Sequence, residues 1–399
     1  MKRIVPYLLL LPLFFCISCM QGVEPINKVI DRGLKRSAEQ ALLMAKSLEH
    51  KEGLFPKSIK NDSLETSTNH WWCCGFFPGQ LWYLYEDMQT PELEHYAELF
   101  TARVEPAKHF TNTHDLGFML YNSFGNGYRL TGNSQYKDIL LTGAQSLATR
   151  YNEHIGLMRS WDFNKKVWQF PVIIDNMMNL EFLLWAAREG GDVRLEEMAV
   201  SHADKTLQYH FRDDFSTYHV VSYDTITALP EKKVTHQGYN DASAWARGEA
   251  WALYGYVMMY RETGRQAYLD LAHQIASFVM NHPNLPEDKI PYWDFDAPNI
   301  PDEPRDASAA AIIASALIEL SQLDAASAKS KDYLQLAEDM LRSLSSPNYL
   351  AEVGSNCHFT LMHSTGSFPG NSEVDVPLTY ADYYYVEALL RMKKVLEKK

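Results

Sequence analysis

The sequence predicts an all-α fold in which twelve helices pair into six hairpins and close into a ring. Apolar residues recur with helical periodicity in twelve segments of the 399-residue chain. Most segments are joined by short links, which favours antiparallel neighbours. The expected helices cover 27–48, 76–88, 91–110, 115–131, 134–150, 175–189, 192–210, 243–262, 266–281, 307–322, 330–345 and 380–396.

Repeated turn residues support this hairpin organisation. Residues 128–133 and 260–265 both contain the pattern Tyr-Arg-x-Thr-Gly directly before a new helix. Gly132 and Gly264 can adopt the left-handed conformation that ends a helix, and Gly190 occupies the equivalent joint of a third pair.

Four expected helices begin at an aspartate, and this spacing predicts a shared site. Asp115, Asp175, Asp241 and Asp306 follow one another at intervals of 60, 66 and 65 residues, a length that fits two helices and two turns. Asp241 and Asp306 each precede an Ala-Ser-Ala sequence, a typical helix N-cap setting. Alternate helices of a closed ring run parallel. We therefore expect all four carboxylates to gather around one mouth.

Four connections are too long to be simple turns. They are rich in aromatic and strand-favouring residues, so we expect short strands and binding residues within them. We interpret residues 20–399 as a single domain. The long connections cover 152–172, 212–240, 282–305 and 346–379.

Charge and composition narrow the class of ligand. The net charge of -13 argues against nucleic acid, which requires a basic surface. An anionic substrate would have to be recognised by local positive groups. Aromatic residues make up 13% of the chain, with 9 Trp and 23 Tyr, and their flat faces can stack on sugar rings as well as fill a core.

The N-terminus is typical of an exported protein. Lys2 and Arg3 precede an apolar run over 4–15 that is too short to cross a bilayer. The following Cys-Ile-Ser-Cys sequence resembles a bacterial lipoprotein cleavage site, which predicts a signal peptide over residues 1–19 and lipidation of Cys19. Simple cleavage is the alternative. We expect a periplasmic protein whose only membrane contact is this lipid anchor.

The remaining cysteines do not suggest a disulfide framework. Cys73, Cys74 and Cys357 are three in number and lack metal-ligand spacing, so we interpret them as small buried apolar residues. No metalloprotease motif, nucleophile elbow or phosphate-binding loop is present in the sequence. We therefore expect no metal and no cofactor.

Asp115 and Asp175 are the candidate catalytic acids. Position alone would make each an N-cap, but Asn176 and Asn179 add polarity near the second of them that packing does not require. Two acids at one mouth are the minimum for general acid–base work on a sugar. Burial raises the pKa of a carboxyl, so we expect the proton donor to be the more buried of the two.

Residues 236–251 are the densest polar and aromatic segment. Arg247 is expected inside the ring of inner helices, where it needs an anion, either a substrate or a buried partner such as Glu249 or Asp241. We favour the substrate, because Gln237, Trp245 and Trp251 add sugar-binding groups nearby. His219 alternates like a strand residue, and alone would be structural.

At these residues the chain resembles the unsaturated glucuronyl hydrolases, glycoside hydrolase family 88. No single motif decides the resemblance, but together they span nearly the whole mature chain in order. The matching stretches are 71–79, 113–118, 174–180, 236–238, 245–251 and 373–385.

The resemblance implies an (α/α)6 barrel and an unusual reaction, hydration of the C4=C5 double bond that a polysaccharide lyase leaves on a terminal uronic acid. It implies that Asp175 is the general acid/base and that Asp115 is a second essential carboxylate. By similarity, six further side chains would surround the unsaturated ring. These are Trp72, His219, Gln237, Trp245, Arg247 and Trp251.

The C-terminal part bears on substrate choice. Family members that prefer sulfated glycosaminoglycan fragments are similar in having Ser-x-x-Ser-x-Lys, and here Ser364 and Ser367 are followed by Pro369. We expect an unsaturated oligosaccharide substrate, a glycosaminoglycan disaccharide. The alternatives are a pectin-fragment (rhamnogalacturonan) hydrolase, a sugar epimerase that would use His219 and His236, and a non-catalytic glycan-binding lipoprotein. Oligomeric state is not predicted.

Overall fold

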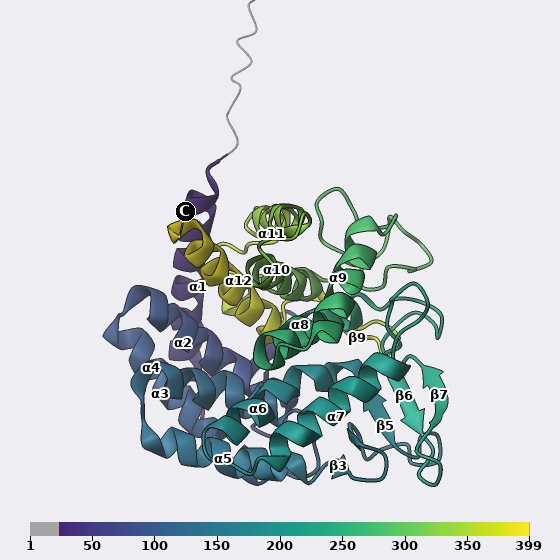
Figure 1. The fold of residues 1–399 in the computed structure, drawn as a ribbon. Helices are drawn as coiled ribbons and strands as arrows, with labels where there is room; N and C mark the ends of the chain where they lie inside the picture. The colour runs from purple at the N-terminus through teal and green to yellow at the C-terminus, as the bar shows by residue number, and fades with distance from the viewer. Residues whose placement is uncertain (1–23, 399) are drawn as a thin grey trace, which may run out of the picture.

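The structure, a computed structural model, describes residues 24–398 and confirms the twelve predicted helical segments. Six of them form an inner ring in which each segment contacts the next and α12 returns to α2, which closes an (α/α)6 barrel (Figure 1). The inner segments are α2 (Phe76–Met88), η3 (Gly117–Gly125) with α4 (Asn126–Thr131), η4 (Ile174–Asn179) with α6 (Leu180–Arg188), α8 (Ala246–Thr263), α10 (Ala307–Leu323) and α12 (Thr379–Glu397).

The other six helices cover this ring from outside. Each packs against inner helices through one apolar face, and α1 lies beside α12, so that the first and last helices meet (Figure 1). The outer helices are α1 (Ile26–Leu48), α3 (Pro91–Val104) with η2 (Glu105–His109), α5 (Ser134–Ala148), α7 (Arg194–Tyr209), α9 (Gln266–Asn281) and α11 (Ser330–Leu344). No helix within residues 24–398 is long and apolar enough to cross a membrane.

The predicted helix ends are largely confirmed. Gly132 and Gly264 have φ angles of 67° and 66° and act as left-handed C-caps. Asp306 is the N-cap of α10, where its carboxylate accepts hydrogen bonds from the backbone N–H groups of Ser308 and Ala309.

The prediction that α8 starts at the cap Asp241 is wrong. The helix begins at Ala246, because the preceding residues bond to the connection over 282–305 instead of to the helix. Ser243 donates to Asp294 at 2.7 Å, and the N–H of Ala244 donates to Asp296 at 2.9 Å. Asp241 accepts from the N–H of Thr235 and caps no helix.

Short antiparallel strands occur in three of the four long connections. The connection over 282–305 instead makes isolated bridges, such as that between Trp245 and Asp294. One further hairpin, β1 with β2, was not predicted. The strands are β1 (Phe55–Lys60), β2 (Ser63–Ser67), β3 (Tyr151–Asn152), β4 (Leu157–Met158), β5 (Pro171–Ile173), β6 (Val220–Tyr223), β7 (Pro230–Val234), β8 (Ser364–Ser367) and β9 (Ser372–Val376).

Two inner segments begin with irregular helix, and a candidate acid lies at each of these starts. Asp115 lies two residues before the π-helix η3, and Asp175 lies in the 3-10 helix η4. A side-chain bond ties the two starts together, since the N–H of Phe118 donates to Asn179 at 2.9 Å. Irregular turns of this kind are frequent at functional sites.

The cysteines of the described chain are unpaired. Cys73 and Cys74 are buried in the apolar core, as predicted. Cys357 departs from the prediction, because it lies partly exposed in η5 (Asn356–His358) between α11 and β8.

Candidate active site

The two candidate acids lie together at the mouth formed by the starts of the inner helices. An ionised Asp115 is close enough to raise the pKa of Asp175. Ser160, from the connection after β4, links their surroundings: its carbonyl lies 3.0 Å from Nδ1 of His114, and its hydroxyl donates to Asn176 at 3.0 Å. Two carboxyls 60 residues apart in sequence thus share one site.

Asp175 sits in an environment that favours a protonated carboxyl. Burial raises its pKa from 3.8 to about 7, the positive charge of Arg247 opposes this shift, and Asp115 reinforces it. Its Oδ2 finds no hydrogen-bond partner within residues 24–398. A carboxyl in this state can give and take a proton near neutral pH.

Asp115 differs in its hydrogen bonds more than in its burial. The side chains of Asp115 and Asp175 are 15% and 13% exposed, so surface area does not separate them. Oδ2 of Asp115 accepts from the hydroxyl of Thr113 at 2.8 Å, and its Oδ1 lies 3.2 Å from Nε2 of His114. Both oxygens of Asp115 thus have a polar neighbour, whereas Oδ2 of Asp175 has no hydrogen-bond partner within residues 24–398.

His219 faces Asp175 as a neutral ring. Its Nδ1 accepts from the N–H groups of His236 and Gln237, at 3.1 and 3.2 Å, so the ring proton lies on Nε2. Burial holds the pKa of His219 well below its usual value. Nε2 is 3.9 Å from Oδ2 of Asp175, beyond hydrogen-bond distance, and both buried atoms are without a hydrogen-bond partner within residues 24–398.

Arg247 already has a buried anionic partner. Its guanidinium donates to Asp306 at 2.9 Å and also to the backbone carbonyls of Thr365 and Gly366. The sequence-based partners, Glu249 and Asp241, were wrong, because the first bonds to Thr217 and the second to Thr235. The planar guanidinium packs 4.6 Å from the ring of Trp245, which itself packs 4.4 Å from His219.

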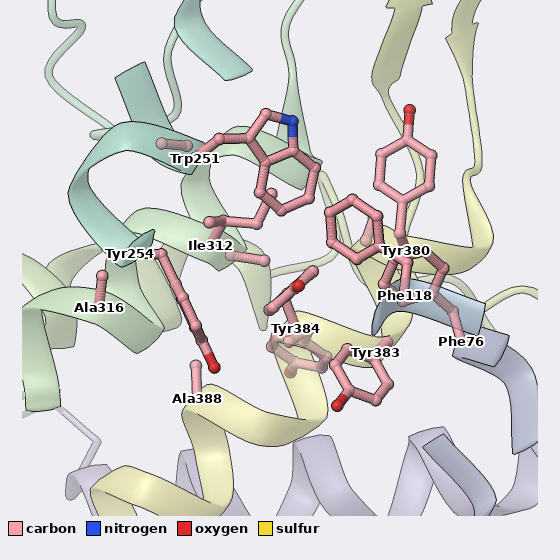
Figure 2. Packing of buried hydrophobic residues seen from close by; sticks show 14 of the residues in the cluster. Phe76, Phe118, Trp251, Tyr254, Ile312, Ala316, Tyr380, Tyr383, Tyr384 and Ala388 are labelled. Atoms are coloured by element: carbon pink, nitrogen blue, oxygen red, sulfur yellow. The ribbon is translucent and has the colours of Figure 1, made fainter. Parts of the chain in front are cut away.

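The tryptophans take different places around the mouth. Trp72 is half-buried and packs 5.5 Å from Phe118. Trp251 is fully buried and contacts Phe118 at 5.2 Å and Tyr384 at 5.5 Å, so it supports the floor of the mouth (Figure 2). Contact between Trp251 and a sugar therefore stays a prediction.

This geometry agrees with what the chain resembles. A model described as Glycosyl Hydrolase Family 88 matches residues 47–394, which is most of the chain. The chain belongs to this family. It is a glycoside hydrolase.

Individual relatives of this family 88 enzyme are similar over most of its length. It is 48% identical over 328 residues to an unsaturated glucuronyl hydrolase of Formosa agariphila, covering 82% of this chain and 81% of the relative. It is 32% identical over 383 residues to an unsaturated chondroitin disaccharide hydrolase of Streptococcus pneumoniae, with 93% and 92% covered.

Solved structures show the same barrel. A crystal structure of an unsaturated glucuronyl hydrolase specific for heparin has a TM-score of 0.88 and 46% identity, over 92% of this chain and 98% of that one. The unsaturated glucuronyl hydrolase of Bacillus sp. GL1 has a TM-score of 0.83 and 28% identity, over 91% and 97%. A Streptococcus agalactiae variant complexed with dGlcA-GalNAc6S has a TM-score of 0.79 and 28% identity, over 93% of both chains.

The β8–β9 hairpin forms one wall of the mouth in this family 88 enzyme. Gln237 donates to the carbonyl of Gly366 at 3.0 Å, beside the Arg247 contact. Ser364 is buried, and its hydroxyl is unpartnered within residues 24–398; Ser367 ends the strand and is half-buried. The structure thus brings both serines to the wall that holds Arg247.

Sequence reasoning missed an aromatic group at this mouth. Trp161 lies 5.8 Å from His219 and 5.2 Å from His236, with Phe163 and Trp168 packed around it. Phe163 is 47% exposed. The run of aromatics in the connection over 152–172 was visible in the sequence, but nothing local indicated that it folds toward His219.

Lys57, on β1, was also missed. Its ammonium lies 3.0 Å from Glu65 and 3.4 Å from Glu373, and 4.8 Å from the ring centre of Trp71. Glu373 lies close to Gly366 of β8, where a methyl group would come within 2.4 Å of its carboxylate. The β1–β2 hairpin therefore brings a cation to the mouth that could have been sought only after that hairpin was recognised.

Proposed function

We propose that this enzyme removes 4,5-unsaturated uronic acid from the non-reducing end of oligosaccharides that polysaccharide lyases produce, by hydrating the C4=C5 bond. The observation that carries the proposal is Asp175, a buried carboxyl with a pKa of about 7 beside a second carboxyl, Asp115. Relatives named as unsaturated glucuronyl hydrolases and chondroitin disaccharide hydrolases support it.

Asp175 is the general acid and then the general base. Its protonated form gives a proton to C4 of the vinyl ether while a water molecule adds to C5 and returns a proton to the Asp175 carboxylate. The resulting hemiketal at C5 opens, and the exposed C1 hemiacetal then expels the rest of the oligosaccharide. One water is consumed, and Asp175 ends in its starting protonation state.

Asp115 acts on Asp175 through its negative charge, which raises the pKa of Asp175. A negative neighbour disfavours loss of the proton from Asp175, so Asp175 keeps its proton until the proton is transferred to C4. Its free lone pairs accept hydroxyl groups of the sugar. His219 donates from Nε2 into the space in front of Asp175, where it orients the attacking water or a ring oxygen.

The remaining mouth residues position the sugar. Trp72 and Trp245 offer flat faces to the ring, and Gln237 offers its amide. Arg247 is already paired with Asp306, so it attracts a substrate carboxylate through its remaining positive potential and does not form a separate ion pair with it.

The substrate class is a glycosaminoglycan disaccharide. Ser367 offers a partly exposed hydroxyl donor on the β8–β9 wall, where it could meet a sulfate oxygen, and the buried Ser364 lies in the same strand. Pro369 leaves that wall without the lysine of the Ser-x-x-Ser-x-Lys pattern.

Absorbance measurements test this function. Unsaturated chondroitin, hyaluronan and heparin disaccharides lose ultraviolet absorbance when the C4=C5 bond is consumed, and unsaturated pectin fragments provide the comparison. We expect loss of absorbance with at least one glycosaminoglycan substrate and none with Asp175→Asn. Activity on pectin fragments alone would overturn the substrate class, and persistent absorbance with all of them would overturn the reaction.

We also propose that the enzyme is a periplasmic lipoprotein, with residues 1–19 removed and Cys19 lipidated. These residues lie outside the described part of the chain. The support is the basic, apolar and cysteine-containing order of the N-terminal sequence. Labelled palmitate should enter the full-length protein and not Cys19→Ala, and a labelled Cys19→Ala protein would contradict the proposal.

A further inference from the structure

A second hollow lies inside the barrel, toward the ends of the inner helices away from Asp115 and Asp175. Its volume is about 390 Å³, within the range of small-molecule sites. Its wall is built by residues of α2, η3, α4, α6, α8 and α12, so the same inner ring that forms the mouth also forms this hollow.

An aromatic layer separates the hollow from the mouth. On α12, Tyr380 lies beneath Arg247, whereas Arg391 of the hollow follows eleven residues later, roughly 16 Å along a helix that rises 1.5 Å per residue. Phe118 and Tyr384 pack between these levels. Figure 2 shows the hydroxyl of Tyr380 pointing one way and those of the Tyr383 and Tyr254 rings pointing the other. The hollow is therefore distinct from the mouth.

Aromatic faces line one side of the hollow. Trp185 packs 5.8 Å from Tyr121 and 5.8 Å from Tyr128, at interplanar angles of 50° and 77°. All three rings are half-buried, so the hollow reaches solvent beside them. Rings that are fixed by their neighbours and still partly bare can stack on the C–H face of a sugar at little entropic cost.

The charges of the wall are already paired with each other. Glu387 accepts from two tyrosine hydroxyls, at 2.8 and 3.0 Å, and from Arg391 at 3.3 Å. Arg391 also binds Glu319 at 2.8 Å, and Glu181 binds Arg261 at 2.6 Å. A charged ligand would have to break one of these buried pairs, which is costly, so the wall favours an uncharged one.

One polar group of the wall is unused. Nδ2 of Asn122 is buried and has no hydrogen-bond partner within residues 24–398. Asn122 lies in the π-helix η3, next to Tyr121. A buried donor without a partner lowers stability, and a ligand hydroxyl or carbonyl in the hollow would supply the missing acceptor.

We propose that this hollow is a second binding site that takes an uncharged monosaccharide. The size, the bare aromatic faces, the paired charges and the unused amide of Asn122 together match a sugar ring that carries hydroxyl or acetamido groups. The proposal concerns the far end of the barrel and does not depend on the reaction at the mouth.

Titration of the full chain with neutral sugars tests the proposal. N-acetylglucosamine, N-acetylgalactosamine and glucose are the probes, glucuronate is the anionic comparison, and binding is followed by ligand-detected saturation-transfer NMR and calorimetry. Asn122→Leu removes the unused amide. Gly125→Ala alters the wall of the hollow, because its methyl group would lie 2.8 Å from the lining ring of Tyr121 and displace that ring. The exposed Asn348→Leu is the matched control.

We expect at least one neutral sugar to bind with a Kd that rises at least tenfold in Asn122→Leu and in Gly125→Ala and stays unchanged in Asn348→Leu. Turnover at the mouth should persist in all three variants. If Gly125→Ala does not fold, Asn122→Leu alone decides, since it replaces the amide by an apolar group of similar size. The proposal is overturned if none of the three neutral sugars binds, if glucuronate binds more tightly, or if the far-end variants leave binding unchanged.

Discussion

Replacing Asp175 by asparagine should make the protein more resistant to unfolding at high pH, by an amount that the buried carboxyl sets. The pKa of this carboxyl is raised from 3.8 to about 7, a shift of about 3 units, and each unit is worth about 1.4 kcal/mol. Because the shift is upward, the group contributes its full stability below pH 3.8 and loses it as the pH rises to about 7.

The folded state therefore bears about 4 kcal/mol of cost above pH 7 that an asparagine does not bear. About 2.5 kcal/mol of this difference should develop between pH 5 and pH 8. Urea unfolding of the wild type and Asp175→Asn across this interval measures it, with Asp213→Asn as an exposed control whose stability should change little. A difference between Asp175→Asn and the wild type that is the same at pH 5 and pH 8 would refute the reasoning.

Three further predictions follow from the same contacts. Since Asp175 must start protonated, kcat/KM should fall about tenfold per pH unit above pH 7. Asp115→Asn should move this fall in kcat/KM to lower pH, because Asp115 raises the pKa of Asp175, and a flat pH profile to pH 9 contradicts the prediction. Asp382→Ala removes the carboxylate that accepts from the buried backbone N–H groups of Thr360 and Leu361, each at 2.8 Å. The free energy of unfolding in urea should fall by roughly 2–5 kcal/mol, and a fall below 1 kcal/mol argues against the contact. Arg247→Met leaves the buried Asp306 without its ion-pair partner and should lower the free energy of unfolding by roughly 3–5 kcal/mol. The double variant with Asp306→Asn is the control and should recover part of this stability.

The barrel itself could be predicted from the sequence because its signals are local. Helical periodicity, short links and the glycines at positions 132 and 264 each report on a few neighbouring residues, and they located all twelve helical segments. The ring then brings Asp115 and Asp175 to one end, because alternate helices of a closed ring run parallel.

The features that were missed or wrong depend on contacts distant in sequence. Asp241 has the local properties of an N-cap, yet Ser243 donates a hydrogen bond to Asp294 in the connection over 282–305, and α8 begins only at Ala246. Similarly, the buried partners considered for Arg247 were near neighbours in sequence, and a substrate anion was favoured over them, although its partner Asp306 lies 59 residues away. Spacing along one helix cannot show such a partner.

The β1–β2 hairpin is a different case, since its signal was present and local. Lys60 pairs with Ser63 across a two-residue loop, and Asn61 and Asp62 have φ angles of 50° and 56°. Asn and Asp are residues that tolerate such angles in tight hairpins, so the pair could have been recognised. The place of Lys57 beside Glu373 would still have been missed, because that contact is distant in sequence.

The order of two events in a single turnover tests the central claim most directly. If Asp175 protonates C4 and water adds to C5, the double bond is consumed before the glycosidic bond breaks. Rapid-quench measurement of ultraviolet absorbance and of the released sugar, with enzyme in excess over an unsaturated disaccharide, should therefore show absorbance lost no later than release. Release of the sugar while the absorbance persists would mean direct displacement at C1, and would contradict the account.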